Sequence, residues 1–66
     1  MRSLNDHPEV DKTVTVYYNY EREGVTQHGN YRGRWTGAEW QMRDPYSRDG
    51  FGPVPENIKL IGWDEM

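Results

Sequence analysis

The stretch that most constrains the fold is Lys12–Tyr20, KTVTVYYNY, in which side chains of two kinds alternate strictly. Successive side chains of a β-strand point to opposite faces, so period two indicates a strand with one buried face. β-Branched and aromatic residues are also the types that favour strands. The sequence therefore predicts a strand over 12–20, with Val14, Val16, Tyr18 and Tyr20 on one face and Thr13, Thr15, Tyr17 and Asn19 on the other.

A second strand is expected over 26–35, after a charged turn at 21–24. The connection is so short that the two strands must be antiparallel. Gly29 and Gly33 interrupt the second strand, which indicates either a bulge or a place where a neighbouring aromatic ring lies over the backbone.

The motif GRWTGAEW, at 33–40, predicts a hairpin whose tight turn is Thr36-Gly37. A third strand over 38–43 would then bring Trp40 within diagonal reach of the preceding strand, beside Gly33 or Tyr31. Both tryptophans of this motif are accordingly expected in the core.

The remaining segments are a polar lead-in over 1–11, a loop over 44–56 and a last strand over 57–63. The loop, DPYSRDGFGPVPE, contains too many Pro and Gly residues for a regular element. In the last strand, NIKLIGW, alternation predicts Ile58 and Leu60 on one face and Ile61 and Trp63 on the other, with a bulge allowed at Gly62.

The fold class expected for residues 1–66 is a single all-β domain, a small antiparallel sheet or SH3-like roll of four to five strands in meander order. A chain this short hides only about 60% of the surface that it exposes when unfolded. Aliphatic side chains are few, but three Trp, five Tyr and one Phe can supply the missing apolar area. The expected core residues are Val14, Val16, Tyr18, Tyr31, Trp35, Trp40, Ile58 and Leu60.

The order of these features resembles the small β-domains of unknown function that are common in tailed phages and bacterial prophages. The shared elements are Val14-x-Val16-Tyr17, Gly29-x-Tyr31-x-Gly33-x-Trp35, Gly37-x-x-Trp40, a Pro-rich loop and Ile58-x-x-Ile61-Gly62-Trp63. The tail Asp64-Glu65-Met66 departs from the proline-containing ending of those domains. The resemblance implies a phage or prophage origin and a small β-sheet, and it implies no catalytic residue.

Few residues offer catalytic or metal-binding chemistry. The chain has no cysteine, and its two histidines, His7 and His28, stand at no spacing that specifies a triad or a metal site. Asp44 and Asp49 lack the register of a calcium loop. We therefore expect a protein that is not an enzyme, with no catalytic, cofactor-binding or metal-binding residues and no cofactor.

The expected location is the cytoplasm of a bacterial host. The absence of cysteine fits a reducing compartment. No apolar run approaches the roughly 18 residues that a membrane span needs, and the first residues lead into no signal-peptide core. No membrane partner is expected.

A binding surface is expected on the sheet face opposite the core, where arginines alternate with polar and aromatic side chains. Its candidate residues are Tyr17, Asn19, Arg32, Arg34, Arg43, Arg48 and Trp63. Tyr, Trp and Arg anchor protein interfaces, which favours a protein partner. Given the implied origin, this partner would be a host protein, and occlusion of a host defence or regulatory protein is one concrete version.

Two alternatives stay open for the same surface. An arginine-rich aromatic face also stacks bases and attracts phosphates, which is the chemistry of a single-stranded nucleic-acid binder. The net charge of −3 does not favour that alternative. The second alternative is self-association, in which leftover aromatic side chains such as Trp63 meet a second copy of the chain.

Overall fold

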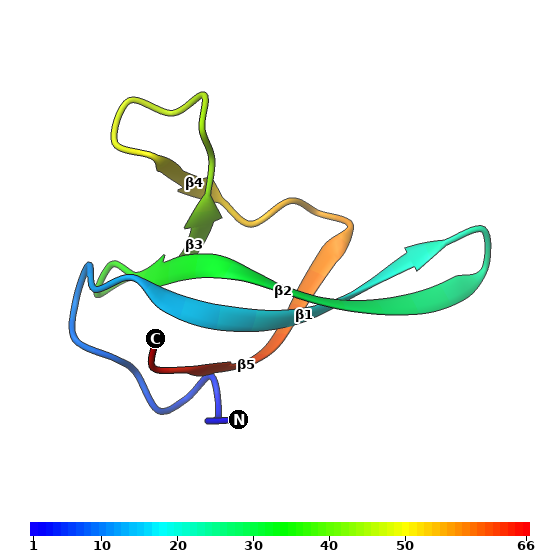
Figure 1. The fold of residues 1–66 in the computed structure, drawn as a ribbon, viewed down its shortest axis with the longest axis horizontal. Coiled ribbons are helices and arrows are strands. Elements are labelled where there is room, and N and C mark those ends of the chain that lie inside the picture. The colour runs from blue at the N-terminus through cyan, green and yellow to red at the C-terminus, as the bar shows by residue number, and fades with distance from the viewer.

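The computed structural model describes residues 1–66 and contains five strands and no helix. The strands are β1 (Val14–Arg22), β2 (Val25–Trp35), β3 (Trp40–Arg43), β4 (Phe51–Pro53) and β5 (Ile58–Asp64). They form one antiparallel sheet in the order β4-β3-β2-β1-β5 (Figure 1). The predicted all-β fold, built as a small antiparallel sheet, is confirmed.

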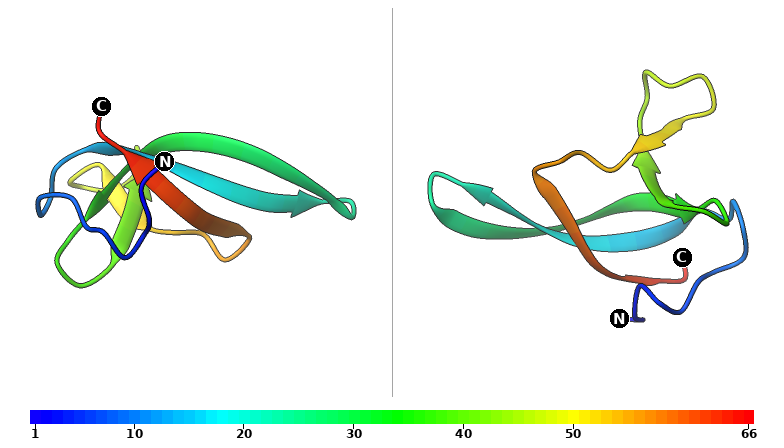
Figure 2. Two further views of the ribbon diagram at one scale, coloured as in Figure 1. Left: turned by 90° about the horizontal axis from the view of Figure 1, so that it is seen from below. Right: turned by 180° about the vertical axis from the view of Figure 1, so that it is seen from behind.

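The meander order holds for β1 to β4, whereas β5 crosses back to pair with β1. The sheet stays open, because β4 and β5 are its two edges. Figure 2 shows that the sheet is strongly twisted and that the β1–β2 hairpin reaches well beyond the other strands.

The β1–β2 hairpin turns at Glu23 and Gly24, whose φ angles are 53° and 78°. Positive φ at both turn positions matches the twist of the flanking strands, so the strands continue to the Arg22–Val25 pair. Tyr18 lies opposite Gly29, and a Cβ at Gly29 would be 2.6 Å from Cζ of the Tyr18 ring. The expected packing of an aromatic ring over this glycine is confirmed.

The second hairpin turns differently from the prediction. Trp35 pairs directly with Trp40, so the loop covers Thr36 to Glu39 and β3 begins two positions later than expected. The Thr36 side chain explains the wider loop, because its Oγ1 accepts hydrogen bonds from the backbone N–H groups of Ala38 (3.3 Å) and Glu39 (3.1 Å). The two indole rings then lie 5.5 Å apart, centroid to centroid.

The sequence predicts an irregular loop over 44–56, but this segment contains the short strand β4. Asp44 and Asp49 organise the turn before this strand: their carboxylates accept the backbone N–H groups of Tyr46 and Phe51, respectively. The Asp44 N–H also donates to the Gly50 carbonyl at 2.8 Å. Pro53 is tolerated in β4 because this strand forms the edge of the sheet.

Trp63 lies on the core face, so its predicted place on the opposite face was wrong. The register of β5 against β1 shifts between Gly62, opposite Tyr17, and Leu60, opposite Tyr18, which leaves Ile61 as an extra, bulged residue. One extra residue reverses the alternation, so Trp63 shares the face of Leu60 and is only 1% exposed.

The buried core consists of Val14, Val16, Met42 and Trp63. Tyr18, Trp40, Val54, Ile58 and Leu60 pack against it and are partly buried. Trp35 is likewise half-buried. Tyr31 is on the core face opposite Val16 but is 46% exposed, which corrects its assignment to the core. β3 has already diverged from β2 at this level, so about half of the residue stays open to solvent.

The polar lead-in over 1–11 packs against the sheet instead of trailing from it. Arg2 forms an antiparallel bridge with Trp63, and the Trp63 Nε1 donates to the carbonyl oxygens of Ser3 and Asp6. The His7 ring stacks on Trp35 with their centroids 3.7 Å apart. The lead-in thus seals one end of the core.

Candidate functional site

The predicted binding residues of β1 and β2 do lie together on the face opposite the core. Tyr17 and Asn19 pair with Asn30 and His28, while Arg32 and Arg34 pair with Thr15 and Gln41. Directly paired residues in adjacent strands point to the same side, and none of these is on the side of Val14 and Val16. The contacts that each side chain makes within the protein determine whether its charge or hydrogen-bonding groups are free to bind a partner.

Arg34 is committed to contacts within the protein. Its side chain is only 16% exposed, and Nη2 lies 2.6 Å from the Asp49 carboxylate. Nε donates to the Gln41 side chain at 2.9 Å and lies 3.9 Å from the Asp11 carboxylate. The guanidinium also covers the Phe51 ring at 4.5 Å. Arg34 therefore ties the lead-in and the 44–50 loop to the sheet and leaves no free charge for a ligand.

The contact with Arg34 also changes the pKa of the Asp49 carboxyl group. The hydrogen bond from Arg34, together with those from the Phe51 N–H and the Ser47 hydroxyl, lowers the pKa of Asp49 from 3.8 to about 2. Each of these donors favours the charged carboxylate. A perturbed pKa often marks a functional site, but here a structural ion pair accounts for it.

Other members of the predicted surface also have partners. The Asn19 Oδ1 lies 2.5 Å from the His28 Nδ1, and Arg32 contacts the Met66 Sδ at 3.4 Å. A hydrogen bond to the Asp64 carboxylate raises the pKa of Tyr17 above its ordinary value of 10.0. Several side chains of this face thus contact one another, and Arg32 stays exposed on it.

Arg48 and Trp63 lie away from that face, whereas Arg43, which follows the core residue Met42, is on the face of Gln41 and Arg34 at the far end of the sheet. Trp63 is in the core. Arg48 belongs to the 44–50 loop and Arg43 to the end of β3; both are exposed and neither forms an ion pair. Their charges are therefore available at the 44–50 end of the molecule.

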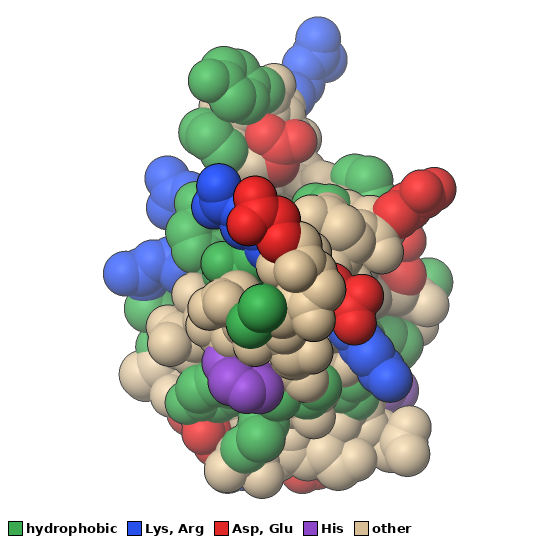
Figure 3. All heavy atoms as spheres, turned by 90° about the vertical axis from the view of Figure 1, so that its right-hand side faces the viewer, with side chains coloured by type: hydrophobic (Ala, Val, Ile, Leu, Met, Phe, Trp, Pro, Cys, Tyr) green, Lys and Arg blue, Asp and Glu red, His purple; other side chains and the backbone are tan.

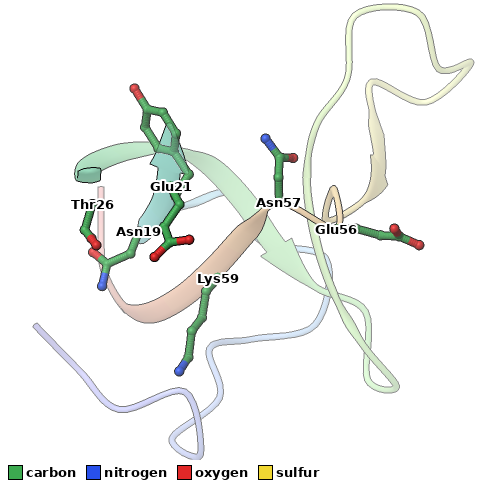
Figure 4. A pocket seen from close by; sticks show the side chains of 7 residues that line it. Asn19, Glu21, Thr26, Glu56, Asn57 and Lys59 are labelled. Atoms are coloured by element: carbon green, nitrogen blue, oxygen red, sulfur yellow. The ribbon is translucent and has the colours of Figure 1, made fainter. Parts of the chain in front are cut away.

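A polar hollow of about 510 Å³ lies between the β1–β2 hairpin and the start of β5. Asn19, Glu21 and Thr26 line it from the hairpin (Figure 4). Lys59 lines it from β5, and Asn57 lines it from the position just before β5. Its charges are of both signs and its walls are open. The hollow offers mainly hydrogen-bonding side chains, and Tyr20 is the one hydrophobic residue in its lining.

A second hollow has a different chemistry and was not anticipated from the sequence. It is a groove of about 400 Å³ between the β1–β2 hairpin and the 44–57 segment, with aromatic, proline and aliphatic walls. We call it the tyrosine groove. Its aromatic and proline residues are Tyr18, Tyr31, Pro45, Tyr46, Pro53 and Pro55.

The tyrosine groove leaves two aromatic rings open to solvent. Tyr31 is 46% exposed and Tyr46 is 97% exposed, although burial of such rings is normally the main apolar gain for a small domain. Met42 and Ile58 form part of the floor. The sequence contained one signal of this groove, a tyrosine among three prolines at 45–55, but proline and glycine there indicated only a loop.

The lining of the tyrosine groove contains one charged residue of each sign. Arg43 lines it, and Asp44, the acid in its wall, already accepts the Tyr46 N–H. Figure 3, which looks at the molecule from the hairpin end, shows hydrophobic side chains at the top and left with basic side chains beside them. Most acidic side chains in this view lie toward the centre and right.

Groups that could support catalysis or hold a metal do not converge. No set of three or more His, Cys, Asp or Glu side chains is placed to bind a metal ion. His7 is stacked on Trp35, and His28 is on the opposite face of the hairpin, paired with Asn19. The tyrosine groove is therefore the strongest candidate site.

Comparison of the chain with protein-family models, curated proteins and solved structures gave no match. The chain contains no helix with the length and apolarity needed to cross a membrane. The assignment of a site therefore depends on the geometry of the chain itself.

Proposed function

We propose that this protein is a non-enzymatic binding module whose partner is another protein, held in the tyrosine groove. The observation that carries the proposal is the pair of exposed rings, Tyr31 and Tyr46, in the walls of one groove. Tyrosine provides a large, rigid contact area with few rotatable bonds, and interfaces are enriched in it. Exposed apolar patches beside polar residues are a common feature of interaction sites.

The tyrosine groove suits a peptide segment better than a small molecule. Its walls come from two separate parts of the chain, and it is open to solvent. Pockets that bind small molecules normally enclose most of their ligand. An extended segment needs only an apolar trough with a few polar contacts beside it.

The resemblance to small phage and prophage domains makes a bacterial host protein the partner to test first. We propose occlusion of a surface of that host protein as the mechanism. Single-stranded nucleic acid binding and self-association stay as predictions. The first of these has lost Arg34 as a free cation, since that side chain is held by Asp49 and Gln41.

Photocrosslinking from the groove tests this function. A photoreactive phenylalanine analogue replaces Tyr46 in the tagged protein, and the matched control carries the analogue at Glu9, an exposed position of the lead-in outside the groove. Irradiation in a bacterial lysate treated with nuclease should crosslink one host protein from position 46 only. The same product should disappear when the Tyr31→Ser substitution is added.

Other products would overturn the proposal. Adducts that vanish with nuclease would assign the surface to nucleic acid. A crosslinked dimer as the sole product would assign it to self-association, and equal labelling from position 46 and from the Glu9 control would show that the tyrosine groove has no preferred partner.

A further inference from the structure

The β2 strand has an edge that no other strand covers. β2 pairs with β1 along its whole length but with β3 only over Gly33–Trp35. The chain turns away after Arg43, where Asp44-Pro45 begins the 44–50 loop (Figure 1). The second edge of Val25–Arg32 is therefore unpaired, and nearly every side chain of this segment is exposed. We call it the open edge.

The direction of the backbone groups along the open edge follows from two observations. The Trp35 carbonyl accepts the Asp11 N–H, which comes from the β1 side, and Arg22 and Val25 close the β1–β2 hairpin as a pair. Backbone direction alternates along an antiparallel strand. Odd-numbered residues of β2 thus face β1, and Thr26, His28, Asn30 and Arg32 direct their N–H and C=O groups outward.

The open edge lacks the features that normally block strand addition. Natural sheets protect their edges with proline, lysine, bulges or short strands. β4 is short and contains Pro53, and β5 carries Lys59, a bulge and the bridge from Arg2. Val25–Arg32 has no proline, lysine or bulge. Its unpaired side is the continuation of the β2 edge that pairs with β3 at Gly33–Trp35.

The open edge and the tyrosine groove meet at Tyr31. This residue belongs to β2, and its ring lines the groove on the core face. We propose, building on the protein-binding function above, that the partner segment adds to β2 as an extended strand beside 26–32. Its backbone pairs with the outward groups of His28 and Asn30, and one of its apolar side chains enters the groove between Tyr31 and Tyr46.

Charge specifies the partner segment further. Arg32 and Arg43 stand near the point where β3 leaves β2, are exposed, and form no ion pair. An acidic residue at the adjacent end of the segment would neutralise them, and such a rim charge mainly provides specificity and faster association. The segment is therefore alternating and apolar, contains no proline along its paired length, and has Asp or Glu at one end.

A displayed library of random dodecapeptides provides the probe. Selection on the wild-type protein should enrich peptides with apolar residues at alternate positions and an acidic residue at one end. Binding should weaken about tenfold with Asn30→Pro, which removes an outward N–H, and stay unchanged with Asn30→Ala, which keeps it. Near-ultraviolet circular dichroism checks that both variants fold.

Amide hydrogen exchange on the wild-type protein decides the matter even if Asn30→Pro does not fold. In the free protein, His28 and Asn30 should exchange fast and Gly29 and Tyr31 slowly; the selected peptide should slow the first pair. Peptides that require Tyr31 but leave His28 and Asn30 unprotected would overturn strand addition and keep the groove. Enrichment of proline-rich peptides would do the same.

Two further outcomes also count against the proposal. Protection of His28 and Asn30 that rises with protein concentration, without any peptide, would assign the open edge to a second copy of the chain. Failure to enrich any peptide over a Tyr31→Ser/Tyr46→Ser control would overturn both the inference and the proposed function.

Discussion

The ring of Tyr18 lies across Gly29 of the neighbouring strand, so closely that no side chain fits beneath it: a Cβ at Gly29 would be 2.6 Å from the Tyr18 Cζ. This contact lets a large aromatic residue lie flat on a sheet that has no helix to cover it. It holds the middle of the long β1–β2 hairpin, where the core ends and the exposed part of the hairpin begins.

Replacing Gly29 by Ala should destabilise the protein by about 1–3 kcal/mol, because the added methyl group displaces the Tyr18 ring. The matched control is Asn30→Ala on the opposite face, which should change the free energy of unfolding by less than about 0.5 kcal/mol. Urea denaturation measures both. Equal stability of the two variants would contradict the packing of Tyr18 over Gly29.

Trp63→Ala should cost about 3–5 kcal/mol and leave most of the molecules unfolded, since the indole completes the core and is 1% exposed. A loss of self-association without unfolding would instead restore the surface role expected from the sequence. Thermal unfolding followed by circular dichroism distinguishes the two results. Tyr46→Ala, a truncation at an exposed ring, is the control and should keep the melting temperature of the wild-type protein.

Acid should weaken the fold through Asp49. Its pKa in the folded protein is about 2, below the ordinary 3.8, so the folded state binds fewer protons than the unfolded state between these values. The stabilisation is complete above about pH 4 and is lost as the pH falls toward 2. Asp49→Asn should lower stability at pH 7 and reduce its loss below pH 4.

Urea midpoints at pH 7 and at pH 2.5 measure this effect of Asp49, with Glu39→Gln as an exposed control that forms no ion pair. A nuclear magnetic resonance titration of the Asp49 carboxyl group that gave an ordinary pKa would contradict the ion pair with Arg34.

Thr36→Val should destabilise the second hairpin by about 1 kcal/mol, because the hydroxyl accepts the N–H groups of Ala38 and Glu39 while the shape of the side chain is kept. Thr36→Ser keeps the hydroxyl and is the matched control. Tryptophan fluorescence, to which Trp35, Trp40 and Trp63 all contribute, follows the denaturation of each variant. If serine and valine were equally destabilising, the turn would owe nothing to this hydroxyl.

Local patterns predicted β1 and β2 well, since strict alternation from Val14 to Tyr20 fixes both the element and its buried face. They failed where one extra residue reversed the alternation of a strand or where a side chain changed the length of a turn. The bulge at Ile61 reversed the direction of Trp63, and the Thr36 hydroxyl widened a turn and shifted Trp40. Neither effect has a periodic signal, because each depends on contacts with another segment.

The candidate site was harder to predict than the fold. Arg34 resembled a free surface cation because its partner, Asp49, is distant in sequence and becomes adjacent only after β3 and β4 form. Tyr31 fitted the core pattern, and its exposure results from the early departure of β3. The tyrosine groove exists because two segments fail to cover each other, which alternation within a single segment does not reveal.

The seal between the lead-in and Trp63 also determines when this protein can fold. The bond from the Trp63 indole to Ser3 joins residues 60 positions apart, so the last strand must be available before the core is complete. Contacts of such long range slow folding, because much of the chain must be ordered before they form. A nascent chain that lacks β5 would expose Val14 and Val16, and we expect it to stay unstructured on the ribosome until that strand emerges.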